Sequence, residues 1–217
     1  MELKLPSNTE GSPLAVFDST GLVFGVSAGQ PDKAGYVSLG GFVVSFQHPL
    51  SHSPTQFVNL YDARNYAAGP FAEMRVARED IERKLAGSVT PERAYALSRS
   101  EWTSLEFNKS GKQILACCAN GLAISIDGFD GGIARAFLSE ITPGATQSTT
   151  PLAACFTSDD KSVIVGNEDG TVSCYQADSG LLARRLRGHV SRVSAVACNP
   201  KYCQLATACT NTAVWVW

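Results

Sequence analysis

Residues 154–175 of the chain read ACFTSDDKSVIVGNEDGTVSCY. Three short apolar segments in this stretch are separated by two polar turns. Small and β-branched apolar residues dominate the segments, as buried strands require. The second turn contains Asp169-Gly170, a pair that favours the positive φ of a tight hairpin. The stretch therefore predicts three consecutive antiparallel strands.

The same pattern occurs on either side of this stretch, within residues 105–127 and 196–217. The first strand of each unit is expected to end at Phe107, Phe156 or Cys198, which are 49 and 42 residues apart. A period of about 40–50 residues with four strands per unit is typical of a β-propeller. We therefore predict an all-β, partial propeller of about four blades, whose last blade lacks its outer strand.

A fourth, earlier unit begins at Pro13, and its first strand is expected to end at Phe17. The 90 residues between Phe17 and Phe107 are interpreted as one blade with two insertions, although two degenerate blades are the alternative. Within the second insertion, Arg78–Leu85 is predicted to be a short surface helix that ends at Gly87. A single domain over residues 1–217 is expected, with blades at about 13–76, 98–138, 151–187 and 190–217 and insertions at 28–54 and 75–96.

Composition and charge exclude several classes of protein. Of the 217 residues, 44% are hydrophobic and 18% are charged, and the formal net charge is −2. This balance favours a globular chain without a general field for nucleic acid or an anionic membrane. No apolar run approaches the ~18 residues of a membrane span, and Met1–Pro6 lacks the pattern of a secretory signal. A soluble intracellular protein is expected.

The seven cysteines form no CxxC pair, and six of them lie inside apolar runs. They are therefore expected to be reduced core residues. His48 and His52 have the spacing of metal ligands, but they lie among loop residues and no partner pair follows. We accordingly expect no metal and no cofactor.

An enzymatic function is not expected, because no catalytic arrangement is apparent. The carboxylates lie mostly in predicted turns, without a second residue at a spacing suited to acid–base catalysis. Residues 128–132, GFDGG, lack the lysine and hydroxyl residue of a phosphate-binding loop. The carboxylates considered were Glu101, Asp127, Asp130, Glu168 and Asp169.

The last unit resembles a repeat of the WD-repeat family. In that family a Gly-His pair, a strand hydroxyl, a turn acid and a tryptophan form a buried hydrogen-bonded set in each blade. Gly188-His189 and the residues that follow have this layout. The resemblance implies a structural tetrad of His189, Thr207, Asn211 and Trp217. Such a set is chemically reasonable because a buried imidazole and a buried indole each need a partner.

Eight motifs in order are similar to the Swd-two type within that family. They are FDSTGLVF (17–24), LYDAR (60–64), GPF (69–71), EWTSL (101–105), GKQIL (111–115), GNEDG (166–170), NPKY (199–202) and ACTN (208–211). The resemblance implies a nuclear, non-catalytic scaffold of COMPASS histone-lysine methyltransferase complexes, PNUTS–protein phosphatase one complexes or, in fungi, the cleavage and polyadenylation factor. Its implied partners are methyltransferase or phosphatase-targeting subunits and the phosphorylated tail of RNA polymerase II. An adaptor of an unrelated complex, such as a ubiquitin ligase, is the alternative.

The tightest basic cluster consists of Arg184, Arg185 and Arg187, which are candidate partner contacts. A phosphate-binding site would need converging cations. Strand alternation places Arg184 on the face opposite to the other two, so the cluster is not a preformed pocket. A solvated face of an outer strand is the other interpretation.

There are three alternatives for how the ring of blades is completed. The resemblance begins at about the fourth blade of the family, so a fragment of a longer protein is expected. Completion by another chain is the second solution. In the third, Met1–Leu5 pairs beside Thr212–Trp217 and closes a ring of four blades.

Overall fold

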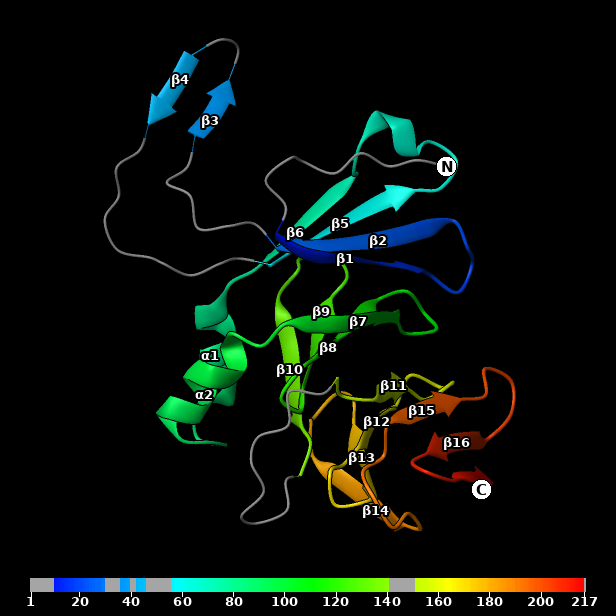
Figure 1. The fold of residues 1–217 in the computed structure, drawn as a ribbon. Coiled ribbons are helices and arrows are strands. Elements are labelled where there is room, and N and C mark those ends of the chain that lie inside the picture. Colours follow the sequence, from blue (N-terminus) through cyan, green and yellow to red (C-terminus); the bar gives the residue numbers. More distant parts are fainter. Residues whose placement is uncertain (1–9, 30–35, 40–41, 46–55, 141–150, 217) are drawn as a thin grey trace.

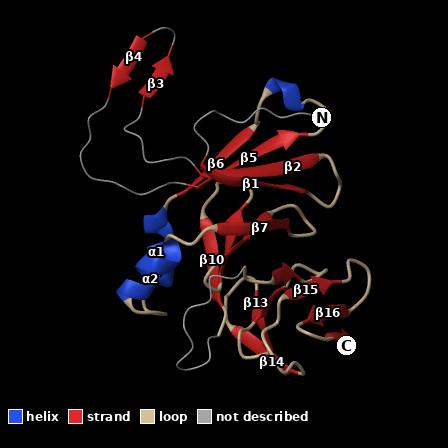
Figure 2. Ribbon diagram, in the orientation of Figure 1, coloured by secondary structure: helices blue, strands red, loops and turns tan. Residues whose placement is uncertain are grey.

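Strands form most of the computed structural model, which describes residues 10–29, 36–39, 42–45, 56–140 and 151–216 (Figures 1 and 2). Four antiparallel sheets follow one another along the chain, and we call them blades 1 to 4. Blade 1 contains β1 (Glu10–Phe17), β2 (Val23–Gly29), β5 (Gln56–Asp62) and β6 (Ala72–Val76). Blade 2 contains β7 (Trp102–Phe107), β8 (Gln113–Cys118), β9 (Leu122–Asp127) and β10 (Ile133–Leu138).

Blade 3 contains β11 (Ala154–Phe156), β12 (Ser162–Gly166), β13 (Thr171–Gln176) and β14 (Leu182–Arg187). Blade 4 contains β15 (Ala195–Cys198), β16 (Gln204–Ala208) and β17 (Thr212–Val216). The remaining elements are β3 (Tyr36–Leu39), β4 (Phe42–Ser45), a 3-10 turn η1 (Tyr66–Ala68), α1 (Arg78–Leu85) and α2 (Pro91–Ser98).

The first strands of the blades are structurally equivalent. They end at Phe17, Phe107, Phe156 and Cys198, the positions expected from the repeat. Strand β1 lies against β7, β7 against β11, and β11 against β15, so successive blades meet along their first strands. The prediction of an all-β, propeller-type fold is therefore confirmed.

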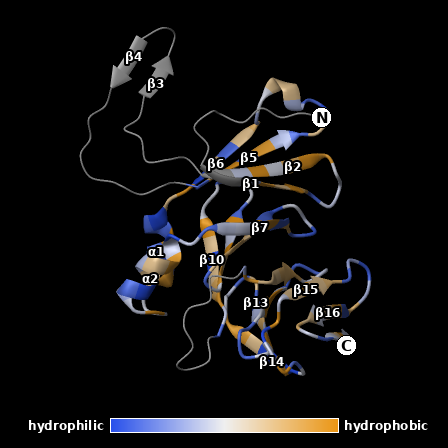
Figure 3. Cartoon of the chain, viewed as in Figure 1, coloured by the Kyte–Doolittle hydropathy of each residue, from blue (hydrophilic) through white to orange (hydrophobic). Residues whose placement is uncertain are grey.

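Alternate residues of one strand enter different cores, as the side-chain period of two requires. On β8, Ile114 and Ala116 pack in a cluster with residues of blade 1. Leu115 and Cys117, whose side chains point to the opposite face of the same strand, pack with residues of blade 3. Blade 2 is thus covered on both faces, and Figure 3 shows hydrophobic residues along its strands.

Two tight turns have the backbone conformation that their residue types favour. Asn120 and Gly121 both have positive φ, 64° and 79°, in the β8–β9 turn. In the β12–β13 turn Gly170 has φ of 82°. Asparagine and glycine tolerate this left-handed region better than other residues, so the turn chemistry matches the backbone.

The second insertion forms two helices rather than a loop around one surface helix. Helix α1 has the predicted bounds, but Ile81 and Leu85 are buried in the cluster between blades 1 and 2. Helix α2 was not expected. Thr90 caps it by accepting a hydrogen bond from the Arg93 N–H at 3.4 Å, and Pro91 occupies its first turn.

The first insertion contains the hairpin of β3 and β4, which agrees with the strand-like pattern at Phe42–Phe46. His48 and His52 lie outside the described residues. In blade 4, the described part of the chain provides β17 with one neighbour, β16. Met1–Leu5 lie outside the described residues, so their pairing with the last strand stays a prediction.

Candidate interaction surface

The turns between the first and second strands have the same hydrogen-bond pattern in all four blades. Each is closed by a backbone hydrogen bond from residue i to the carbonyl of residue i+5, at 2.9–3.0 Å. The side chain of residue i caps the turn by accepting backbone N–H bonds, as polar turn residues do. Residue i is Asp18, Asn108, Thr157 or Asn199, and it directly follows the end of the first strand.

Hydrogen bonds also tie these turns to one another across the blades. The Ser19 hydroxyl donates to the Lys109 carbonyl at 2.8 Å. The Lys109 and Ser110 N–H groups donate to the Asp160 carboxylate at 2.7 and 2.9 Å. Lys109 Nζ donates to the Pro200 carbonyl at 3.5 Å. The turns therefore gather on one side of the molecule, and we call residues 18–21, 108–111, 157–160 and 199–202 the turn face.

A cavity of about 160 Å³ lies beneath the turn face and is lined by residues of every blade. Its lining includes Ser19, Glu106, Phe156 and Cys198. Burial raises the pKa of the Glu106 carboxyl to about 7, although the Phe156 N–H donates a hydrogen bond to it. This carboxyl is therefore partly protonated near neutral pH.

Blade 4 contains a hydrogen-bonded chain of three side chains. The Trp215 Nε1–H donates to Thr207 Oγ1 at 2.8 Å, and this oxygen lies 2.7 Å from His189 Nε2. In the neutral imidazole the Thr207 hydroxyl can donate to Nε2, which leaves the proton on Nδ1. That nitrogen lies 3.4 Å from Asn211 Oδ1 and 3.2 Å from Cys209 Sγ.

The indole of this set belongs to Trp215, where Trp217 had been expected. Thr207 pairs with Ala213 in the β16–β17 ladder, so the side chain two residues farther along the same face is Trp215. Gly188 permits the close fit, because a Cβ atom there would lie 2.8 Å from the Trp215 ring. Trp217 lies outside the described residues. Thr207 is buried, but His189 and Trp215 are only partly buried and Asn211 is exposed.

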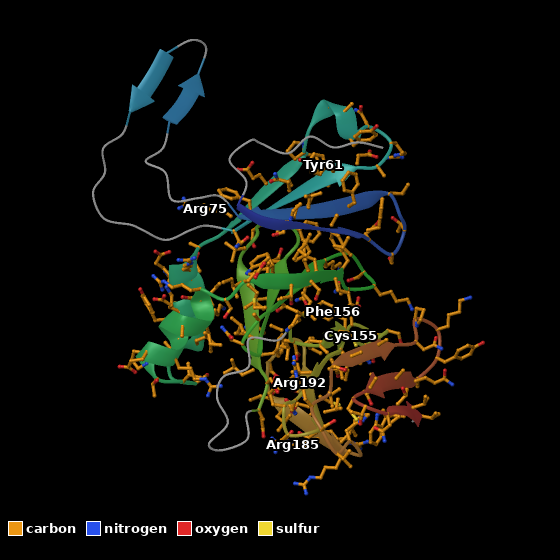
Figure 4. The ribbon with its side chains drawn as sticks, in the orientation of Figure 1. Tyr61, Arg75, Cys155, Phe156, Arg185 and Arg192 are labelled. Atoms are coloured by element: carbon orange, nitrogen blue, oxygen red, sulfur yellow. The ribbon has the colours of Figure 1, made fainter. Side chains whose placement is uncertain are left out.

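The structure separates the three arginines of the basic cluster. Arg185, labelled in Figure 4, forms an ion pair with Glu140. Arg184 is paired in register with Cys174 and lines a second cavity, of about 350 Å³, between blades 3 and 4. Arg187 is exposed. The three side chains do not converge on one site.

A buried polar group in blade 3 was missed by the analysis of the sequence. The Asn167 side-chain amide donates to the Thr171 and Ser173 hydroxyls, each at 2.8 Å, and its oxygen accepts from the Glu140 N–H at 3.0 Å. Asn167 and Ser173 are fully buried. Ser173, between the apolar Val172 and Cys174 of β13, was the available signal, since buried hydroxyls need partners.

Three of the carboxylates considered for catalysis have structural contacts. Asp127 accepts hydrogen bonds from the Phe129 and Asp130 N–H groups, and Asp169 accepts from Thr171. Glu168 pairs with Arg192 at 3.0 Å. Across the described ranges, His, Cys, Asp and Glu residues form no group of three or more suited to a metal ion. A membrane-crossing helix, long and apolar enough, is likewise absent from the part that the structure describes.

Comparisons with known proteins agree with this architecture. The family model "WD domain, G-beta repeat" matches residues 180–217. "WD repeat-containing protein 82" of Drosophila melanogaster is 27% identical over 207 residues, which are 95% of this chain and 50% of that protein. "Protein ANTHESIS POMOTING FACTOR 1" of Arabidopsis thaliana is 24% identical over 206 residues, which are 95% of this chain and 48% of that protein.

The fold is similar to that of a solved propeller. "Structure of Dos1 propeller" superposes with a TM-score of 0.58 at 10% identity and covers 93% of this chain and 40% of that chain. The chain spans about half the length of the curated relatives that it matches. Together with the repeated blades, these findings show a propeller-type fold whose residues 180–217 are similar to a WD repeat and whose sequence is similar to WD repeat-containing protein 82 over 95% of the chain.

Proposed function

We propose that the chain is a non-catalytic scaffold that docks partner proteins in a nuclear complex. The complex is of the histone-methyltransferase or phosphatase type and is linked to RNA polymerase II transcription and termination. Homology to WD repeat-containing protein 82 and the motifs similar to the Swd-two type support this proposal. Its partners are then methyltransferase or phosphatase-targeting subunits.

The observation that carries the docking role is the turn face. Its turns are capped internally and joined across blades, so the surface is formed before any partner arrives. A preformed surface loses little conformational entropy on binding. Two exposed aromatic side chains lie on or beside it, Tyr202 at 66% exposure and Phe17 at 55%. Aromatic side chains frequently dominate binding energy at protein interfaces.

The arginines extend the proposal to a phosphorylated segment. Arg184 and Arg187 are exposed and lie on opposite faces of β14, so each would contact a separate phosphate of the polymerase tail. Arg185 serves instead to join β14 to Glu140.

Affinity purification from nuclear extract tests the proposal. A tagged full chain should recover methyltransferase or phosphatase-targeting subunits. Tyr202→Ala should reduce that recovery about tenfold, as loss of an interface anchor does. Tyr95→Ala is the matched control, because Tyr95 is a comparably exposed tyrosine on α2, at 55%.

Two results would contradict the proposal. Recovery of cullin-type partners in place of these subunits would assign the chain to a ubiquitin ligase. Equal recovery by Tyr202→Ala and Tyr95→Ala would move the docking site away from the turn face.

A further inference from the structure

Two cysteines meet across the boundary between blades 3 and 4. Cys155, which is labelled in Figure 4, lies on β11, and Cys198 is the last residue of β15. Their sulfur atoms are 3.5 Å apart, in van der Waals contact. The strands that carry them lie side by side without being paired in one sheet. A covalent bond between these atoms would therefore join two blades.

The two thiols differ in their access to solvent. Cys155 is only 5% exposed. Cys198 is partly exposed, and it lines both the cavity of about 350 Å³ between the blades and the one of about 160 Å³ below the turn face. A small oxidant can therefore reach Cys198, while Cys155 lies behind it.

The electrostatics of the pair assign the same roles. The Cys155 thiol donates to the Cys198 sulfur, which lowers the pKa of Cys198 and raises the pKa of Cys155. The charge of the nearby Glu106 carboxylate acts in the opposite direction on Cys198, but the hydrogen bond from Cys155 is the larger effect, so the pKa of Cys198 stays below its ordinary value. Since the thiolate is the reactive form, Cys198 is the nucleophile and Cys155 is the proton-bearing partner.

We propose that Cys155 and Cys198 form a modification site for hydroperoxides, at which oxidation closes a disulfide between blades 3 and 4. The Cys198 thiolate attacks the peroxide, so that an S–O bond forms, the O–O bond breaks, and the leaving oxygen departs as an alcohol or water after taking a proton. Cys198 is then a sulfenic acid. The Cys155 sulfur attacks it, the S–S bond forms, the S–O bond breaks, and the hydroxide leaves as water with the Cys155 proton.

In total, the two thiols lose two electrons and two protons, and one hydroperoxide is reduced by those two electrons to an alcohol or water together with one further water. The sulfur atoms must approach from 3.5 Å to a bond length of about 2.05 Å. The product joins positions 155 and 198 along the first strands of neighbouring blades, so it restrains blade 4 against separation from blade 3.

Peptide mapping after oxidation tests the site. The full chain carrying Cys203→Ser, which removes an exposed thiol, is treated with hydrogen peroxide at neutral pH, alkylated in denaturant and digested with trypsin. Lys161, Arg184 and Lys201 are cleavage sites, so Cys155, Cys174 and Cys198 lie in separate peptides. We expect a Cys155–Cys198 peptide that is absent after reduction, and a melting temperature about 5–10 °C higher in the oxidised chain.

Two variants sharpen the test. Cys174→Ala is the matched control, because Cys174 lines the same cavity as Cys198, and it should leave the link unchanged. Cys155→Ala should abolish the link and leave a sulfenic acid at Cys198 that a 1,3-diketone traps. If Cys155→Ala does not fold, mapping of the parent chain alone decides the matter. Full alkylation of Cys155 after oxidation, or a Cys174–Cys198 link in its place, would overturn the proposal.

Discussion

Blades 2 and 4 contain the same antiparallel strands in very different surroundings. On β8, the consecutive residues Ile114, Leu115 and Ala116 are all fully buried. On β17, exposed and partly buried residues alternate, and Val214 and Val216 are 65% and 72% exposed. Blade 2 lies between two other blades, whereas the described part of the chain covers blade 4 on one face.

This difference separates two ways to stabilise a blade. Blade 2 relies on apolar side chains that enter cores on both faces, as strands in doubly covered sheets do. Blade 4 adds a chain of polar side chains, in which Thr207 joins His189 to Trp215. Stability should therefore be distributed unevenly along the chain, with each blade sensitive to a different kind of substitution.

The largest contrast is expected between Leu115→Ala in blade 2 and Val214→Ala in blade 4. Leu115 is fully buried, so its truncation leaves a cavity and should lower the free energy of unfolding by about 3–4 kcal/mol. Val214 is exposed, and its truncation should change stability by under about 0.5 kcal/mol. Urea unfolding of both variants measures the difference, and equal losses would contradict the proposed difference between the blades.

Trp215 should carry the next largest effect. Trp215→Ala removes packing against the cluster of blades 3 and 4 together with a hydrogen bond, and should lower stability by about 2–3 kcal/mol, since the ring is partly exposed. Trp215→Phe keeps one aromatic ring and loses the N–H donor, and it should lose about 1 kcal/mol. Trp217→Ala tests the position that the family resemblance implied, and a larger loss of stability than that of Trp215→Ala in thermal unfolding would assign the indole of the tetrad to Trp217.

Thr207→Val tests the polar chain without changing the shape of the side chain. The substitution leaves the Trp215 N–H and the His189 Nε2 atom without their common partner, so we expect a loss of about 1–2 kcal/mol. Chemical denaturation measures it. Thr212→Val, at an exposed position of the same sheet, should be nearly neutral. An equal loss of stability in both variants would mean that Thr207→Val acts through β-propensity and not through the two hydrogen bonds.

Glu106 is the exception within blade 2, and its effect should be the smallest. Its folded pKa of about 7 exceeds the ordinary value of 4.5, so the folded chain binds more protons than the unfolded chain between these values. Its contribution is thus complete below pH 4.5 and is lost as the pH rises through about 7. At pH 8 Glu106→Gln should be more stable than the parent by about 1 kcal/mol, with no gain at pH 4. A pH-independent difference in melting curves would contradict this assignment.

The local sequence pattern was sufficient to predict the repeat of strands and the bounds of one helix. The first-strand ends at Phe107, Phe156 and Cys198 and the bounds Arg78–Leu85 follow from alternation, turn residues and charge spacing, which act over a few neighbours. Helix α2 was missed although Thr90 and Pro91 form a recognisable start, because it lacks charged pairs at helical spacing such as Asp80–Arg83 of α1.

Pairing between strands and blades required the tertiary structure. The resemblance to the WD-repeat family implied Trp217, whereas the register of β16 and β17 places Trp215 against Thr207. In the same way Arg185 meets Glu140, and Cys155 meets Cys198, 43 residues away. The sequence by itself determined strands, turns and their period, because those depend on neighbours along the chain. Which side chains meet depended on how one sheet packs against the next, and only the folded arrangement decided that.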